Sequence, residues 1–290
     1  MDPMWLGIDT AGEICSVALA DARHLYAEYT WRSLRRHTRE VAPRIRQLLA
    51  DQGITAAELG GIALTIGPGS YTGLRTGLAV AKGLALGARL QVVGVPTLDV
   101  AAAPYSPPFV PRETRLWGVM DVGKGRIAAA AYPAQVEIHE ANRDAAPTLA
   151  ANLDAALTLA ANLDASPTLV AQPEFGAVPA LAAWAEHGGA TAFATWPAIG
   201  SAPLRTVAEL LADATPGEWV VGEMADSLRA ELAAAGLHVL APPAGVRRAA
   251  WLVALALADG ATEGARYAMA RAGDWAALAA LVPLYLNAVV

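Results

Sequence analysis

The sequence predicts an α/β protein built on a mixed β-sheet, and three observations support this class. Over the first hundred residues, apolar runs and segments of helical spacing follow the order strand, strand, strand, helix, strand, helix, strand. A glycine-rich turn at residues 67–69 separates the fourth strand from the helix after it. The composition, 55% hydrophobic and 17% charged, indicates a large buried core and excludes a disordered chain.

The expected elements follow from apolar spacing and turn residues. Gly12 and Asp21 separate the first three apolar runs, and Gly53 ends the first helix. Pro43 lies inside that helical pattern, so the helix either begins near it or kinks there. Ser70 and Thr72 are alternative N-caps of the second helix. Strands are expected at 4–8, 14–19, 25–31, 62–66 and 90–95, and helices at 39–49, 72–86 and 97–103.

A proline-rich stretch divides the chain into two expected domains. Residues 1–103 form the N-terminal domain, residues 104–115 the linker, and residues 116–290 a C-terminal α/β domain. The second domain opens with a predicted hairpin, and a ten-residue repeat at about 144–169 is interpreted as a dispensable insertion rather than a solenoid. Further elements are expected at 116–121, 126–132, 178–186, 219–222, 224–235, 237–240 and 249–258.

Charge and cysteine usage narrow the function classes. The net charge of −6 argues against a stand-alone nucleic-acid-binding protein. Cys15 is the single cysteine, which excludes a disulfide framework and favours a reducing compartment. With no basic region before an apolar run near residue 1, we expect a cytoplasmic protein without a membrane segment. Residues 32–46 carry a net charge of +5, interpreted either as a solvated helix face or as a contact for phosphate or an acidic partner.

Two segments are candidates for nucleotide or anion contact. In IGPGSYTGLR, Gly67 and Gly69 allow close backbone approach, and the amides after Ser70 could form an anion nest. The segment matches neither the dinucleotide fingerprint, the Walker loop nor the nucleophile elbow, so a functional loop and a tight turn both remain open. Asp9 and Thr10 are either a metal or phosphate site or a turn. The five histidines have no ligand spacing, so no metal site is predicted.

Small residues recur every fourth position on the helix that follows the glycine loop. Gly73, Gly77, Ala81 and Ala85 lie along one helix face. Glycine inside a helix costs up to about 1 kcal/mol relative to alanine, so close packing of another helix is expected to compensate. That helix belongs either to this chain or to a partner.

Long stretches of the sequence resemble the TsaB (YeaZ) family. They are LGIDTAGEICSVAL, RRHTREVAPRIRQLL, IALTIGPGSYTGLRTGLAVAKGLA, GVPTLDVAA and PLYLNAVV, and the resemblance is closest over residues 4–103. It implies a two-domain actin-like, RNase H-like fold with mixed sheets flanked by helices. It also implies a non-catalytic partner subunit that supports TsaD in forming N6-threonylcarbamoyladenosine beside the anticodon of tRNA.

The resemblance further implies partners and an interface. The expected partners are TsaD and the ATPase TsaE, with tRNA reached through the complex and a homodimer when the chain is free. No cofactor is expected in the isolated chain, and ATP or ADP would enter with the partners. The alternatives are a nucleotide-dependent small-molecule kinase of the same fold and a peptidase-like homologue. The interface with TsaD is expected on two helices, at Val41, Ile45, Gly73, Leu74, Arg75, Gly77, Leu78 and Ala81.

Overall fold

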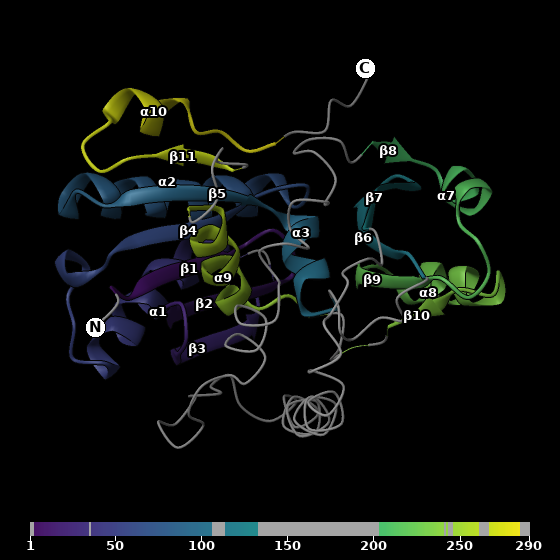
Figure 1. The fold of residues 1–290 in the computed structure, drawn as a ribbon, viewed down its shortest axis with the longest axis horizontal. Helices are drawn as coiled ribbons and strands as arrows, with labels where there is room; N and C mark the ends of the chain where they lie inside the picture. Colours follow the sequence, from purple (N-terminus) through teal and green to yellow (C-terminus); the bar gives the residue numbers. More distant parts are fainter. Residues whose placement is uncertain are drawn as a thin grey trace, which may run out of the picture.

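The computed structural model describes residues 3–34, 36–105, 114–132, 203–240, 242, 246–260 and 267–284. These residues form two mixed β-sheets that lie side by side, with helices packed on them (Figure 1). The predicted repeat at 144–169, the predicted helix at 178–186 and most of the predicted linker lie outside the described residues.

The first sheet has six strands in the order β11-β5-β4-β1-β2-β3. The strands β1, β2 and β3 form an antiparallel meander, whereas β1, β4 and β5 run parallel. The short strand β11 adds antiparallel to β5. The strands span Trp5–Asp9 (β1), Ile14–Ala20 (β2), Leu25–Arg32 (β3), Gly61–Gly67 (β4), Gln91–Pro96 (β5) and Ala268–Ala270 (β11).

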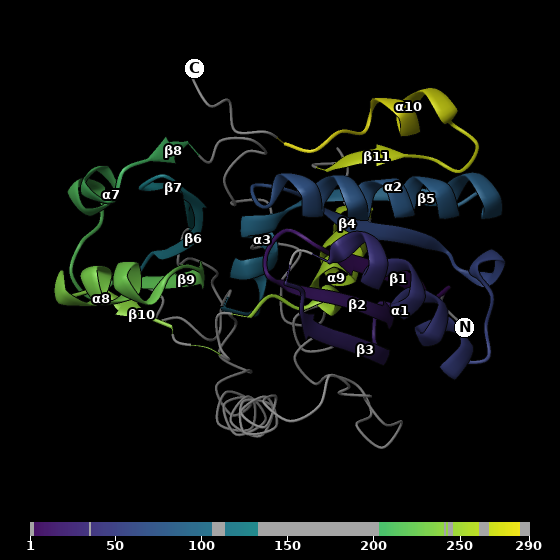
Figure 2. The same ribbon diagram turned by 180° about the vertical axis from the view of Figure 1, so that it is seen from behind.

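Two helices, α1 (His37–Asp51) and α2 (Tyr71–Ala88), lie beside each other on one face of this sheet (Figure 2). Their apolar faces share a core with the sheet. The helix α1 begins at His37, so Pro43 lies inside it. The Ser70 hydroxyl caps α2 by accepting a hydrogen bond from the Gly73 amide at 3.2 Å, which confirms one of the two predicted caps. The single-turn helix η1 (Ala56–Glu58) connects α1 to β4.

The opposite face of the first sheet is covered by α9 (Ala249–Gly260) and α3 (Thr97–Ala102). The helix α9 is apolar on nearly every side, and most of its residues are buried, as expected for a helix inside a core. Leu98 of α3 belongs to a cluster that also includes Trp251 of α9 and Leu116 of the second sheet. One apolar core therefore continues from the first sheet to the second. A short helix, η2 (Ala103–Tyr105), follows α3.

The second sheet repeats the topology of the first. Its order is β10-β9-β6-β7-β8. The strands β6, β7 and β8 form an antiparallel meander, whereas β6, β9 and β10 run parallel. This order matches β5-β4-β1-β2-β3, so both halves use one strand arrangement, and the predicted two-part α/β fold class is confirmed. The strands span Leu116–Gly123 (β6), Arg126–Tyr132 (β7), Leu204–Arg205 (β8), Trp219–Glu223 (β9) and His238–Val239 (β10). The helices α7 (Val207–Asp213) and α8 (Asp226–Ala234) share the separate apolar core of this sheet.

The structure differs from the expected domain division at the C-terminal end. The helix α9, the strand β11 and the helix α10 (Trp275–Ala280) return to the first sheet, although their residues were assigned to the second domain. The physical reason is burial: α9 needs apolar neighbours on several sides, and the inner face of the first sheet supplies them.

Within the described residues, no helix is long and apolar enough to cross a membrane.

Candidate functional site

The C-terminal end of β1 meets the glycine loop and the start of α2. The Ser70 amide donates a hydrogen bond to the Ala11 carbonyl at 2.6 Å, and the Thr10 hydroxyl donates one to the Gly73 carbonyl at 2.9 Å. Gly69 has φ of +155°, and a Cβ atom there would overlap the Ala11 carbonyl oxygen. The structure thus brings the two candidate anion-contact segments together.

Asp9 is fully buried at this junction and is held by three donors. One oxygen, Oδ1, accepts from the Ala11 amide at 2.9 Å and the Thr65 hydroxyl at 3.2 Å. The other, Oδ2, accepts from Nε of Arg247 at 2.9 Å. The buried Arg247 also donates from Nη1 to Glu223 Oε2, at 3.0 Å. Asp9 ends β1 and Glu223 ends β9, so the arginine ties one sheet to the other.

The two ion pairs of Arg247, with Asp9 and with Glu223, explain why a buried arginine is tolerated. Burial lowers the pKa of Arg247, but the carboxylates of Asp9 and Glu223 raise it by more, so the net direction is upward. The guanidinium remains charged and neutralises the buried Asp9 carboxylate. Neither Arg247 nor Glu223 stands out in the sequence, because 238 positions separate Arg247 from Asp9 and no local motif links them.

The polar groups of the candidate anion site are therefore used inside the chain. Asp9 binds Arg247, the Thr10 hydroxyl binds α2, and the Ser70 hydroxyl caps α2. Gly67, with φ of +118°, packs against Leu284, whose amide donates to the Ile66 carbonyl at 2.5 Å. Between a functional loop and a tight turn, the geometry favours the turn. Within the described residues, no group of three or more His, Cys, Asp or Glu side chains is arranged to hold a metal ion.

The small-residue stripe of α2 faces inward, which corrects the expected interface. Gly73, Gly77 and Ala81 are buried, and a Cβ atom on Gly73 would overlap the Thr10 carbonyl oxygen. The stripe therefore lets α2 approach the end of β1, and this contact within the chain compensates for the glycines. Seven of the eight predicted interface residues are buried in the described structure, and only Arg75 is exposed. The buried seven are Val41, Ile45, Gly73, Leu74, Gly77, Leu78 and Ala81.

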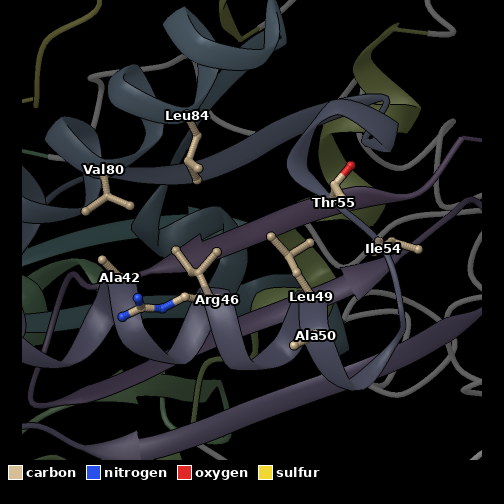
Figure 3. Close-up of a pocket in the computed structure, with 9 residues that line it drawn as sticks. Ala42, Arg46, Leu49, Ala50, Ile54, Thr55, Val80 and Leu84 are labelled. Atoms are coloured by element: carbon tan, nitrogen blue, oxygen red, sulfur yellow. The ribbon is translucent and has the colours of Figure 1, made fainter.

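A different surface of the same two helices is open. An apolar groove of about 390 Å³ runs between α1 and α2. Figure 3 shows Ala42, Arg46 and Leu49 on one wall and Val80 and Leu84 on the other. Spacing of four places Ala42, Arg46 and Ala50 on one side of α1, and this pattern is a signal that could have indicated the groove. The remaining lining residues are Ile45, Ile54 and Thr55.

Small residues also occur on the solvent side of α2. A Cβ atom added at Gly83 or at Gly87 would meet no neighbouring atom within 4 Å, and Ala79 is exposed. By helical spacing, Gly83 and Gly87 lie beside the groove residues Val80 and Leu84. Small exposed residues beside an apolar groove allow a second helix to approach closely.

Cys15 and His37 form a buried pair with 3.2 Å between Sγ and Nδ1. Burial, reinforced by the charge of Asp9, raises the thiol pKa far above its ordinary value, so the thiol stays protonated at neutral pH. Burial lowers the pKa of His37 and outweighs the opposing charges of Glu40 and Glu223. The pair is shielded from solvent, so it lacks the exposure and the thiolate that a cysteine nucleophile needs.

Comparisons with known proteins relate this chain to proteins named for tRNA threonylcarbamoyladenosine. A family model described as "TsaD: tRNA N6-adenosine threonylcarbamoyltransferase" matches residues 31–192. The chain is 42% identical over 97 residues to the Escherichia coli "tRNA threonylcarbamoyladenosine biosynthesis protein TsaB", a match that covers 33% of this chain and 42% of that protein. It is 34% identical over 98 residues to the Bacillus subtilis protein of the same name, covering 34% and 43%.

These matches span less than half the length of the two TsaB proteins. Among solved structures, the chain is similar to "YeaZ from Pseudomonas aeruginosa" at 27% identity and a TM-score of 0.42. That similarity covers 47% of this chain and 62% of the other.

Proposed function

This chain belongs to the TsaD family, tRNA N6-adenosine threonylcarbamoyltransferase, and from that premise we propose that it is a non-catalytic partner subunit of a tRNA-modifying complex. The complex would form N6-threonylcarbamoyladenosine beside the anticodon, with TsaD as the catalytic subunit. The likeness to proteins named for threonylcarbamoyladenosine biosynthesis supports this role. The observation that carries the proposal is the open apolar groove between α1 and α2.

The hydrogen bonds and the ion pair that Asp9 makes within the chain support a non-catalytic role. Its carboxylate accepts hydrogen bonds from Arg247, Thr65 and the Ala11 amide, so its two oxygens are already satisfied within the chain. A kinase of this fold would need an acidic group free to meet a nucleotide or a metal ion. We propose that ATP or ADP enters with TsaD and the ATPase TsaE, and that tRNA is reached through the assembled complex.

The docking surface for TsaD is, in this proposal, the groove and not the buried stripe. The walls of the groove supply apolar area from Ala42, Ala50, Val80 and Leu84. The exposed Gly83 beside it leaves room for a partner helix at the usual separation of about 8–10 Å. A helical hairpin or helix pair on TsaD would fill the groove and remove its apolar walls from water.

Ala42→Leu tests this surface, since the added side chain occupies the groove without entering the core. Ala42 is exposed, so we expect the thermal melt of the free chain to change little. Binding to TsaD of the same organism, measured by titration calorimetry, should weaken about 5- to 150-fold, the equivalent of about 1–3 kcal/mol of overpacking. Ala230→Leu, at an exposed position of α8, is the matched control and should bind as the wild type does.

These measurements test docking at the groove, the partner-subunit role and the kinase alternative separately. Equal affinity of Ala42→Leu and wild type would contradict docking at the groove. Absence of any TsaD binding by the wild-type chain would contradict the partner-subunit role itself. Turnover of nucleotide by the purified chain alone, lost in Asp9→Asn, would favour the kinase alternative.

A further inference from the structure

One carboxylate of the second sheet reaches across to residues packed on the first. Glu223 ends β9, and its Oε1 accepts a hydrogen bond at 2.8 Å from the Glu13 amide, in the turn between β1 and β2. Its Oε2 accepts from Nη1 of Arg247 at 3.0 Å. Arg247 lies two residues before α9, the helix that covers the first sheet. The contacts of this carboxylate across the two sheets are called the Glu223 latch below.

Glycines on both sides allow the latch to fit closely. Gly12 is buried, and a Cβ atom there would overlap Oε2 of Glu223, so the missing side chain leaves room for the carboxylate. In the second sheet, Gly222 has φ of +141°, and a Cβ atom there would overlap the Val119 carbonyl oxygen of β6. The strand that presents Glu223 is therefore packed tightly on its neighbour.

A second, apolar connection between the sheets runs through α3. This helix packs against β4 and β5 of the first sheet and against β6, β7 and β9 of the second (Figure 1). Leu98 of α3 belongs to the apolar cluster that spans both sheets. The buried Asp99 of α3 accepts hydrogen bonds from the hydroxyls of Tyr132, at 2.7 Å, and Tyr267, at 3.0 Å. Tyr132 ends β7, whereas Tyr267 directly precedes β11 of the first sheet.

The two connections restrain the second sheet in different ways. Apolar contacts are non-directional, so a helix packed between two sheets permits small sliding and rotation while its area stays buried. Hydrogen bonds weaken steeply when their distance and angle change, so the Glu223 latch fixes one orientation. The Glu223 side chain is 31% exposed, so water can replace its partners without opening the apolar core.

We propose that the Glu223 latch sets the angle between the two sheets, and that its release lets the second sheet rotate about α3. The released state keeps the apolar contacts of α3 and loses those of Glu223 with Gly12, Glu13 and Arg247. Arg247 keeps its buried ion pair with Asp9, at 2.9 Å, so release leaves no buried carboxylate without its partner. Release is therefore a conformational step and not unfolding. The inference concerns this chain alone and does not depend on the proposed function.

Residual dipolar couplings of backbone amides, measured by NMR in a weakly aligning medium, test the latch because they report the relative orientation of rigid parts. In the wild-type chain, one alignment tensor should fit the amides of β1, β2 and β4 together with those of β6, β7 and β9. In Glu223→Ala, the two sheets should require tensors that differ in magnitude or axis. Hydrogen exchange of the Glu13 amide should be about 10- to 150-fold faster in that variant, the range expected for losing a hydrogen bond to a charged acceptor.

Gly12→Ala releases the latch without altering Glu223. The added methyl group overlaps the far end of the flexible Glu223 side chain, which can move aside, so the fold should be retained. This variant should also require two tensors. Combining it with Glu223→Ala should add nothing further, since both changes remove the same contacts.

The matched control is Glu13→Ala, which removes an exposed carboxylate from the same turn and keeps the backbone amide. That carboxylate pairs with Arg32 of the first sheet at 2.9 Å and does not reach the second sheet. One tensor should therefore fit both sheets of the control.

A single tensor for both sheets in Glu223→Ala would overturn the inference, because α3 alone would then hold the orientation. Two tensors in the wild-type chain would also overturn it, since the latch would then not fix the angle. The amides of β4 and β9 should remain protected from exchange in every variant, which shows that each sheet stays folded. If Gly12→Ala loses that protection, Glu223→Ala alone decides the inference, because its side chain is partly exposed and its loss should not unfold the chain.

Discussion

Adding one methyl group at two glycines of α2 should change stability in opposite directions. At Gly73, a Cβ atom overlaps the carbonyl oxygen of Thr10, and no flexible side chain can move aside. Gly73→Ala should therefore lower the free energy of unfolding by about 1–3 kcal/mol, the usual cost of overpacking. At Gly83, nothing lies within 4 Å of the added atom, so only helix propensity changes. Gly83→Ala should raise that free energy by about 0.5–1 kcal/mol.

Thermal and urea unfolding, followed by circular dichroism, measure this contrast. A change of 1 kcal/mol corresponds to about 2–4 °C in Tm for domains of 150–250 residues, so the two variants should melt several degrees apart. The urea m-values should match that of wild type, because neither substitution alters the surface exposed on unfolding. If Gly73→Ala proves as stable as Gly83→Ala, the stripe is not packed on β1, and its assignment as an inward face is refuted.

Two further predictions concern buried charge. Arg247→Met should lower the free energy of unfolding, measured in urea, by about 3–5 kcal/mol, because it leaves the buried Asp9 carboxylate without its ion-pair partner. Glu223→Gln, at a partly exposed side chain, should lower it by less than about 1 kcal/mol. Equal losses in the two variants would contradict the conclusion that the ion pair of Arg247 with Asp9 is the more important one. The lowered pKa of His37 means that the unfolded chain binds a proton there below about pH 6.5 while the native chain resists it, so stability should fall as the pH drops from 7.5 to 5. His37→Gln should show a shallower fall in Tm over that range, and parallel curves would contradict the assignment.

Local patterns in the sequence predict the fold class and most of its elements. Apolar runs with turn residues between them predict β1 to β5, because strands such as β1 and β4 are buried on both faces and therefore appear as continuous apolar runs. The local sequence offers Ser70 and Thr72 as N-caps of α2, because capping depends on the residues of the first turn, and the structure uses Ser70. The helix α7 was missed although Thr206 and Glu209 form a capping box, a local signal that the sequence does contain.

Tertiary structure decided which faces are inside and which distant residues meet. The spacing of Gly73, Gly77 and Ala81 shows that they share a face, but only the position of β1 shows that this face is buried. The tie between Asp9, Arg247 and Glu223 joins three distant segments, and no local pattern encodes such a contact. The return of α9 and β11 to the first sheet has the same cause: burial depends on neighbours in space, and these are distant in sequence.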